Sequence, residues 1–130
     1  MALKKRESKL FQRIKNNIKN IDFTRIESTT IQGIPDVNGC GNGVEFWLEL
    51  KSTPDNIPVL SKFQIAWCFK RTQHGGRVFI LHEALSQRQL KLYRVSCVDY
   101  KNILHLCYSL PNPVPRSRWA DLADQLLGVH

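Results

Sequence analysis

The sequence predicts an α/β protein in which a central mixed β-sheet is flanked by helices. Three observations favour this class. Residues 44–51 alternate between apolar and other side chains with the period of two that is typical of a strand. Residues 4–20 and 62–74 carry apolar side chains at helical spacing. Further strand-like segments lie between and after these helices, so the predicted order of elements is α-β-β-β-α-β-β-α.

The first half of the chain is expected to form one helix and then three strands. Residues 4–20 place an apolar stripe on one side of a helix, and its members are Leu10, Phe11, Ile14, Ile18 and Ile21. The sequence "NGCGNG" at 38–43 is rich in residues that accept a positive φ and indicates a hairpin turn. The other expected segments are a strand at 23–28, a turn at 33–35, a strand that starts at 36–38, a strand at 44–51 and a loop at 52–58.

The second half is expected to contain a buried helix, two short strands and a terminal helix. Ser61 is a suitable N-cap for a helix over 62–74, which Gly75 and Gly76 end. Because this helix is apolar almost all round, we expect it to be largely buried. Residues 97–110 fit either a strand or a helix. The other expected segments are strands at 77–81 and 91–95, a proline-rich connector at 111–116 and a helix at 117–127.

Length and composition are those of one globular domain. The chain has 130 residues, of which 42% are hydrophobic and 23% are charged, so we expect one domain over 1–130 with its core at about 4–96. No apolar run approaches the ~20 residues that a membrane span needs. The N-terminal sequence "MALKKRESKLF" lacks the apolar core of a signal peptide. We therefore expect a soluble, cytoplasmic protein.

The net charge of the chain indicates the class of its partner. Nineteen Lys and Arg against eleven Asp and Glu give a net charge of +8 and favour an anionic partner, of which nucleic acid is the commonest.

The four cysteines form no C-x-x-C pair, and none has a histidine at zinc-finger spacing. We expect four reduced and mostly buried thiols rather than a metal site.

Two acids and a lysine stand on strands that are predicted to be buried. Glu49 and Lys51 share one face of a strand, with their bases about 7 Å apart, and Asp36 begins a neighbouring strand from which it can lie opposite Glu49. Two converging carboxylates suit a hard cation such as Mg²⁺. A lysine beside that cation can orient or deprotonate a water, or neutralise a phosphate. An E-x-K sequence alone is more typical of a solvated strand, but the apolar opposite face of this strand favours a site.

Glu7 is a further candidate, with two open interpretations. It lies three and four positions before Leu10 and Phe11 and therefore falls on the apolar stripe of the first helix. A carboxylate that points at a core needs a cation or a metal as partner. Alternatively, Glu7 bends out to water at the start of the helix, where the helix dipole favours an acid.

The sequences "GIPDV", "WLELK" and "SKFQIAW" resemble the motifs of the PD-(D/E)xK nuclease superfamily. The VRR-NUC group, which is similar in plan to archaeal-type Holliday junction resolvases, is the best match. The resemblance covers roughly residues 7–82 and implies a restriction-endonuclease-like core with the order α-β-β-β-α-β. Residues beyond about 90 correspond to nothing in this pattern.

The resemblance implies a role for each residue of the site. Asp36 and Glu49 would bind Mg²⁺ together with the main-chain carbonyl of Leu50, and Mn²⁺ is expected to substitute. Lys51 would position or activate the attacking water. Glu7 would complete the site, either directly on the metal or through water.

Further contacts are implied outside the metal site. Gln64 would brace Lys51 or the substrate phosphate, unless it is an ordinary helix glutamine. Ser52 would touch DNA. Basic side chains would neutralise DNA phosphates without reading sequence, although each is as typical of a solvated surface; the candidates are Lys4, Lys5, Lys9, Lys62, Lys70 and Arg71.

The sequence therefore predicts a Mg²⁺-dependent, structure-specific endodeoxyribonuclease. We expect it to resolve four-way (Holliday) junctions or other branched DNA in recombination, as a homodimer that places two active sites on a symmetric junction. Such a small resolvase fits a bacterium or a bacterial virus as its source. The alternatives are a nick, flap or restriction-type nuclease and a non-catalytic basic DNA-binding module.

Overall fold

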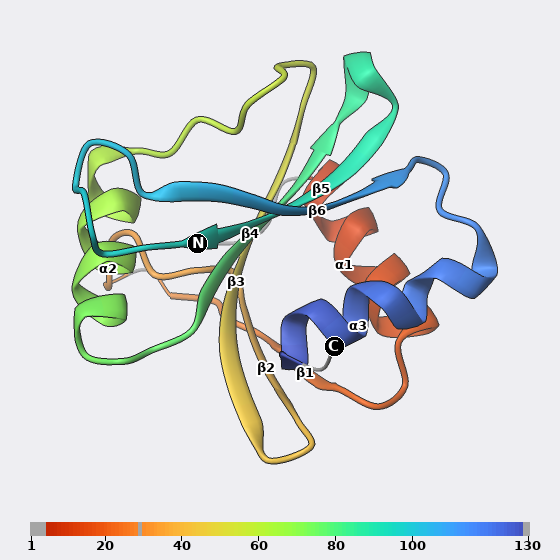
Figure 1. Cartoon of the computed structure of the whole chain (residues 1–130), viewed down its shortest axis with the longest axis horizontal. Helices are drawn as coiled ribbons and strands as arrows, with labels where there is room; N and C mark the ends of the chain where they lie inside the picture. Colours follow the sequence, from red (N-terminus) through yellow and green to blue (C-terminus); the bar gives the residue numbers. More distant parts are fainter. Residues whose placement is uncertain (1–4, 29, 129–130) are drawn as a thin grey trace.

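The computed structural model describes residues 5–28 and 30–128 and shows a six-stranded sheet with helices on both faces (Figure 1). The predicted class, a mixed sheet flanked by helices, is therefore confirmed. The elements follow one another as α1 (Lys5–Asn17), β1 (Asp22–Arg25), β2 (Val37–Gly41), β3 (Val44–Thr53), α2 (Lys62–Gln73), β4 (Val78–Ala84), a 3₁₀ turn (Leu85–Gln87), β5 (Gln89–Val95), β6 (Leu104–Pro111), a second 3₁₀ turn (Arg116–Arg118) and α3 (Trp119–Leu127).

The strands lie in the sheet in the order in which they occur in the chain. Each pair is antiparallel except β3 and β4, which are parallel because helix α2 carries the chain back to the starting edge. The β2–β3 hairpin turns at Asn42 and Gly43, whose φ angles of 51° and 75° belong to a tight two-residue turn. This hairpin and the crossover through α2 bring residues 36, 49, 51 and 64 to one region of one sheet face.

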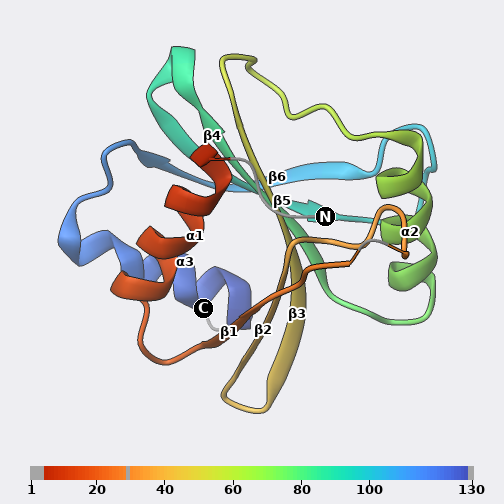
Figure 2. The ribbon, with the colours of Figure 1, turned by 180° about the vertical axis from the view of Figure 1, so that it is seen from behind.

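The two faces of the sheet carry separate hydrophobic clusters. Helices α1 and α3 cover one face, and α2 covers the other (Figures 1 and 2). Alternate residues of β3 divide between them, so that Phe46, Leu48 and Leu50 pack towards α1 and α3, whereas Trp47 packs towards α2. The larger cluster is on the α1 and α3 side and the smaller one is under α2, where Cys68, Val78, Ile80 and their neighbours meet.

Several predicted boundaries change. The strand expected at 23–28 ends at Arg25, and the loop expected from residue 52 begins only after Thr53, because β4 pairs with β3 as far as this residue. Residues 97–110, which fitted a strand or a helix, contribute strand β6 from Leu104. Strand β6 belongs to the same sheet as the strands of the first half of the chain, which carries the motifs. Helix α3 packs into the same larger hydrophobic cluster as that half.

Two predictions of burial are wrong. In helix α2 only Cys68 is buried, because one side of the helix rests on the sheet and the other faces solvent, with Phe63 46% exposed. The cysteines are all free, as expected, but Cys40 and Cys107 are exposed because each lies on an outward-facing position of a strand. Over residues 5–28 and 30–128, no helix is both long and apolar enough to cross a membrane.

Candidate active site

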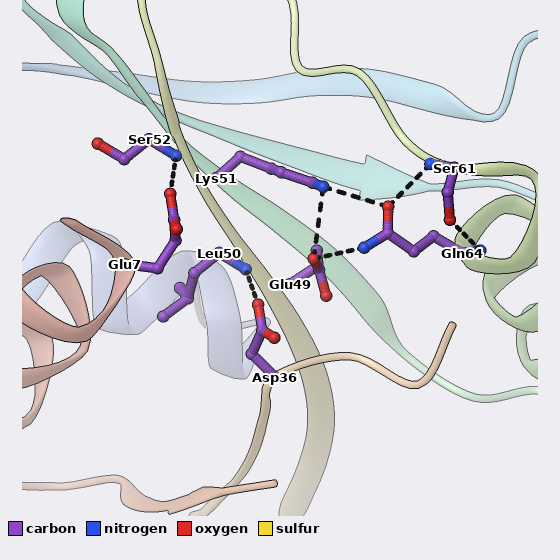
Figure 3. Close-up of polar contacts among 8 residues, drawn as sticks. All are labelled: Glu7, Asp36, Glu49, Leu50, Lys51, Ser52, Ser61 and Gln64. Carbon is purple, nitrogen blue, oxygen red and sulfur yellow. Dashed lines mark hydrogen bonds and ion pairs between the residues drawn. The ribbon is translucent and has the colours of Figure 1, made fainter. Parts of the chain in front are cut away.

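A cavity of about 760 Å³ opens between strand β3, the N-terminal end of α2 and the loop before β2. Its walls include every residue for which the sequence predicted a catalytic or metal-binding role, together with Ser52; these are Glu7, Asp36, Glu49, Leu50, Lys51 and Gln64. Figure 3 shows Glu49 and Lys51 directed from β3 towards Gln64 of α2, Asp36 against the strand at Leu50, and Glu7 approaching the strand from α1. Side chains that are up to 57 positions apart in the sequence therefore share one hollow.

The acidic pair at the base of the cavity consists of Asp36 and Glu49. Val37 pairs with Leu48 across the β2–β3 hairpin, so Asp36, which directly precedes β2, lies beside Glu49. One Asp36 carboxylate oxygen accepts a hydrogen bond from the main-chain N–H of Leu50 at 3.0 Å. This bond holds Asp36 against the strand that carries Glu49.

Burial raises the pKa of both members of the acidic pair. Glu49 is 4% exposed, and burial followed by the charge of Asp36 raises its pKa from 4.5 to about 8, against the opposing effect of Lys51. Burial also raises the pKa of Asp36, although the hydrogen bond from Leu50 acts in the other direction. A buried glutamate with a raised pKa beside a second acid is typical of a functional site.

Gln64 links the acid to the lysine. Its Nε2 donates to Glu49 Oε2 at 2.8 Å, while its Oε1 accepts from Lys51 Nζ at 3.2 Å and from the Ser61 main-chain N–H at 2.9 Å. Lys51 Nζ is also 3.7 Å from Glu49 Oε2. Ser61 in turn caps α2, since its Oγ accepts from the main-chain N–H of Gln64 at 3.2 Å. The first turn of α2 therefore fixes Lys51 and Glu49 relative to each other (Figure 3).

Glu7 points inward rather than to water. It is 8% exposed, and its Oε2 accepts a hydrogen bond from the Ser52 main-chain N–H at 2.9 Å. The Ser52 hydroxyl donates to Glu83 Oε1 at 2.7 Å, and the other Glu83 oxygen accepts from Arg13 and Asn112. Burial of Glu83 would raise its pKa, but these hydrogen bonds outweigh that effect, so its pKa is lowered. The network joins α1, β3 and β4 on the side of the sheet away from α2.

The donor set suits one hard cation. Glu49 Oε1 is buried and finds no hydrogen-bond partner in the described part of the chain, so a strong acceptor faces the cavity unpaired. Within residues 5–28 and 30–128, no three His, Cys, Asp or Glu side chains lie close enough to share an ion. Glu7 turns one carboxylate oxygen to the Ser52 main-chain N–H, and its role at the metal stays a prediction. Two carboxylates with a main-chain carbonyl, waters and a phosphate are the kind of set that Mg²⁺ accepts.

The basic residues predicted to contact DNA fall on two faces. Lys5 and Lys9 lie on α1, whereas Lys62, Lys70 and Arg71 lie on α2, and all are exposed. Lys4 lies outside the described residues. Ser52 is buried and uses its hydroxyl on Glu83, so its contact with DNA stays a prediction without support from its surroundings.

Sequence reasoning missed Glu83 and the conformation of Gly33. Glu83 follows a buried strand segment, and no spacing rule connects it to Ser52, because the two meet only through the parallel β3–β4 register. Gly33 has a φ of 82°, and a Cβ there would lie 2.1 Å from the Phe63 carbonyl oxygen. The glycine of the G-x-P-D sequence therefore lets the loop before Asp36 pass directly against the start of α2.

Comparison with known structures identifies the fold as restriction-endonuclease-like. The Holliday junction resolvase Hjc from the archaeal hyperthermophile Archaeoglobus fulgidus is similar over 95% of this chain and 99% of its own, with a TM-score of 0.59 and 11% sequence identity. A scan against protein-family models and a search of curated proteins find no match. The likeness at this identity establishes the shared fold, whereas the VRR-NUC resemblance has no support beyond its motifs.

Proposed function

We propose that the protein is a Mg²⁺-dependent endodeoxyribonuclease that cuts branched DNA, with four-way junctions as its first candidate substrate. The observation that supports this most strongly is the convergence of Asp36, Glu49, Lys51 and Gln64 in one cavity. An acid pair in which Glu49 is buried and has an unpaired oxygen, beside a lysine, fits metal-assisted hydrolysis of a phosphodiester. The net charge of +8 fits a polyanionic substrate.

Each residue of the site has a separate proposed role. Asp36 and Glu49, with the Leu50 carbonyl, would hold Mg²⁺, and Mn²⁺ is expected to substitute. When bound, the cation would stabilise negative charge on the phosphate and make the attacking water more acidic. Lys51 lies where its ammonium group can orient that water or neutralise the phosphate. Gln64 holds Lys51 and Glu49 at their separation.

The similarity to a resolvase and the small size support branched DNA rather than a specific sequence. The described residues contain no additional recognition unit outside the sheet and its helices. A homodimer would place two such cavities on the two strands of a symmetric junction. Nicks, flaps and linear duplexes are the competing substrates of the same chemistry.

Cleavage of a substrate panel tests the proposal. Labelled junction, flap, nicked and linear DNA are incubated with Mg²⁺, with Mn²⁺ and with EDTA. We expect the junction to be cut in either metal and to remain intact in EDTA. Asp36→Asn should cut at least about 100-fold more slowly, since even indirect partners of a metal site cost 10- to 100-fold. Asp22→Asn, at an exposed position of β1, is the charge-matched control and should remain active.

The outcomes separate the alternatives. If flaps or nicks are cut faster than junctions, the nuclease proposal stands and the junction proposal fails. If wild type and Asp36→Asn bind DNA equally and neither cuts it, the protein is a DNA-binding module that does not cleave.

A further inference from the structure

A second cavity, of about 610 Å³, lies at the opposite end of α2 from the acidic pair. No carboxylate lines it, and three of its residues are basic or can become so; the lining consists of Trp67, Lys70, Arg71, His74, Gly75 and Gly76. Lys70, Arg71 and His74 are all exposed to solvent. The site is therefore open to an anion, and its side chains carry no compensating negative charge.

Arg71 is held in a fixed orientation by two tryptophans. Its guanidinium carbon lies 4.6 Å from the Trp67 ring centre and 5.2 Å from that of Trp47. The two rings meet edge to face with centres 5.3 Å apart. Contact between a guanidinium and aromatic ring faces leaves the N–H groups at its edge available to an anion. In the described part of the chain, these N–H groups have neither an ion pair nor a hydrogen bond.

Gly76 leaves the space that the Arg71 side chain occupies. A Cβ at position 76 would lie 2.6 Å from Arg71 Cγ and 2.7 Å from its Cδ. The φ of Gly76 is not in the left-handed region, so its backbone conformation does not itself require glycine. The lack of a side chain at Gly76 therefore leaves room for the side chain of Arg71.

The end of the helix does not repel an anion from this cavity. The exposed carbonyls of a helix C-terminus carry partial negative charge. Here the Arg71 carbonyl accepts from the main-chain N–H groups of His74 and Gly76, and the Thr72 carbonyl accepts from that of Gly75. The His74 ring also donates through Nδ1 to the Lys70 carbonyl at 2.9 Å. Three carbonyls of the last turn are thus already paired.

The second cavity and the acidic pair share the same strand and the same helix. Trp47 is two residues from Glu49 on the same face of β3, and Arg71 is seven residues from Gln64 along α2. At 1.5 Å per helical residue, the latter offset is roughly 10 Å. Phosphates of one DNA strand advance about 3.4 Å along the duplex axis and lie farther apart than this in a straight line, so an offset of roughly 10 Å corresponds to at most about three nucleotides.

We propose that Arg71, packed against Trp47 and Trp67 and assisted by Lys70, binds one DNA backbone phosphate within about three nucleotides of the phosphate that is cut. This inference rests on the proposed function, because the cut position defines the count. Contact with a single phosphate by a prearranged guanidinium would fix the register of the strand over the acidic pair. It would not read sequence.

DNA binding without cleavage tests the proposal. Fluorescein-labelled four-way junctions and duplexes are titrated in EDTA at several salt concentrations with wild type, Arg71→Ala and Arg71→Lys. Arg116→Ala, at an exposed arginine next to α3 on the other side of the sheet, is the matched control. We expect Arg71→Ala to bind roughly ten- to hundredfold more weakly and to reduce the slope of log K against log salt by about 0.9. Arg71→Lys should keep the slope but lose part of the affinity, because lysine does not form the planar stack.

A scan with neutral methylphosphonate linkages identifies the phosphate. Wild type should lose affinity when one particular linkage within about three nucleotides of the mapped cut is neutral, and Arg71→Ala should be insensitive to that replacement. The proposal is overturned if Arg71→Ala binds as Arg116→Ala does, or if it remains sensitive to the same linkage. If wild type does not cleave DNA but its DNA binding still depends on Arg71, the nuclease proposal is refuted and this phosphate site stands. If wild type binds no DNA, both proposals are refuted.

Discussion

Replacement of Glu49 by Gln should change the pH dependence of stability. Burial and Asp36 raise the pKa of Glu49 from 4.5 to about 8 in the folded protein. Between these values the folded state holds a proton that the unfolded state releases, so wild-type stability falls as pH rises from 4.5 towards 8. Glutamine resembles the protonated acid and cannot ionise. Glu49→Gln should therefore lack this loss.

The magnitude follows from the two pKa values. Each pH unit between them corresponds to 1.36 kcal/mol. Without bound metal, the proton that Glu49 keeps in the folded state and releases in the unfolded state should cost wild type about 3 kcal/mol of stability at pH 7 and about 4 kcal/mol at pH 8, relative to low pH. Glu49→Gln should match wild type at pH 5 and exceed its free energy of unfolding by about these amounts at neutral and alkaline pH.

Urea unfolding in EDTA at pH 5 to 9 measures this difference. The exposed Glu45 lies on the same strand, so Glu45→Gln is the control and should follow wild type at each pH. Adding Mg²⁺ should restore wild-type stability at pH 8, by about 2.7 kcal/mol at 100 times Kd, and should help Glu49→Gln much less. If wild type and Glu49→Gln lose stability in parallel over this range, the acid is not held protonated and the account of the cavity is wrong.

Two further substitutions test the elements that hold the site. Ser61→Ala removes the N-cap of α2 and should lower the free energy of unfolding by about 1 kcal/mol, whereas Ser61→Thr should retain most of the wild-type stability. Thermal unfolding measures both variants. Equal stability of the two would show that the cap contributes nothing. Gly33→Ala combines a strained φ with a clash against the Phe63 carbonyl and should cost well over about 1 kcal/mol. Gly43 has a similar φ of 75° but open space around it, so Gly43→Ala should lower the free energy of unfolding less, and the difference measures the clash. An equal loss for both variants would mean that the loop before β2 moves to relieve the clash.

The sequence was most informative where one strand or helix determines the outcome. The alternation of residues 44–51 predicted the two faces of β3, and Ser61 predicted the start of α2. The apolar stripe of the first helix indicated that Glu7 could point inward, and it does. These signals depend on residues close together in the chain, whose relative placement follows from the geometry of a strand or a helix.

The remaining features depend on how distant segments pack. The exposure of one side of α2 follows from its position on the sheet, which its composition does not determine. The link from Ser52 to Glu83 arises from the parallel register of β3 and β4. The stack of Arg71 on Trp47 and Trp67 joins a strand to a helix and has no sequence motif.

The placement of the three tryptophans gives the protein its own optical reporter. Trp47 and Trp67 are partly exposed beside Arg71, whereas Trp119 is 5% exposed in the cluster under α1 and α3. A quencher such as iodide reaches the first two rings and not the third. Intrinsic emission therefore separates events at the outer end of α2 from changes in the interior of the molecule, with no dye attached.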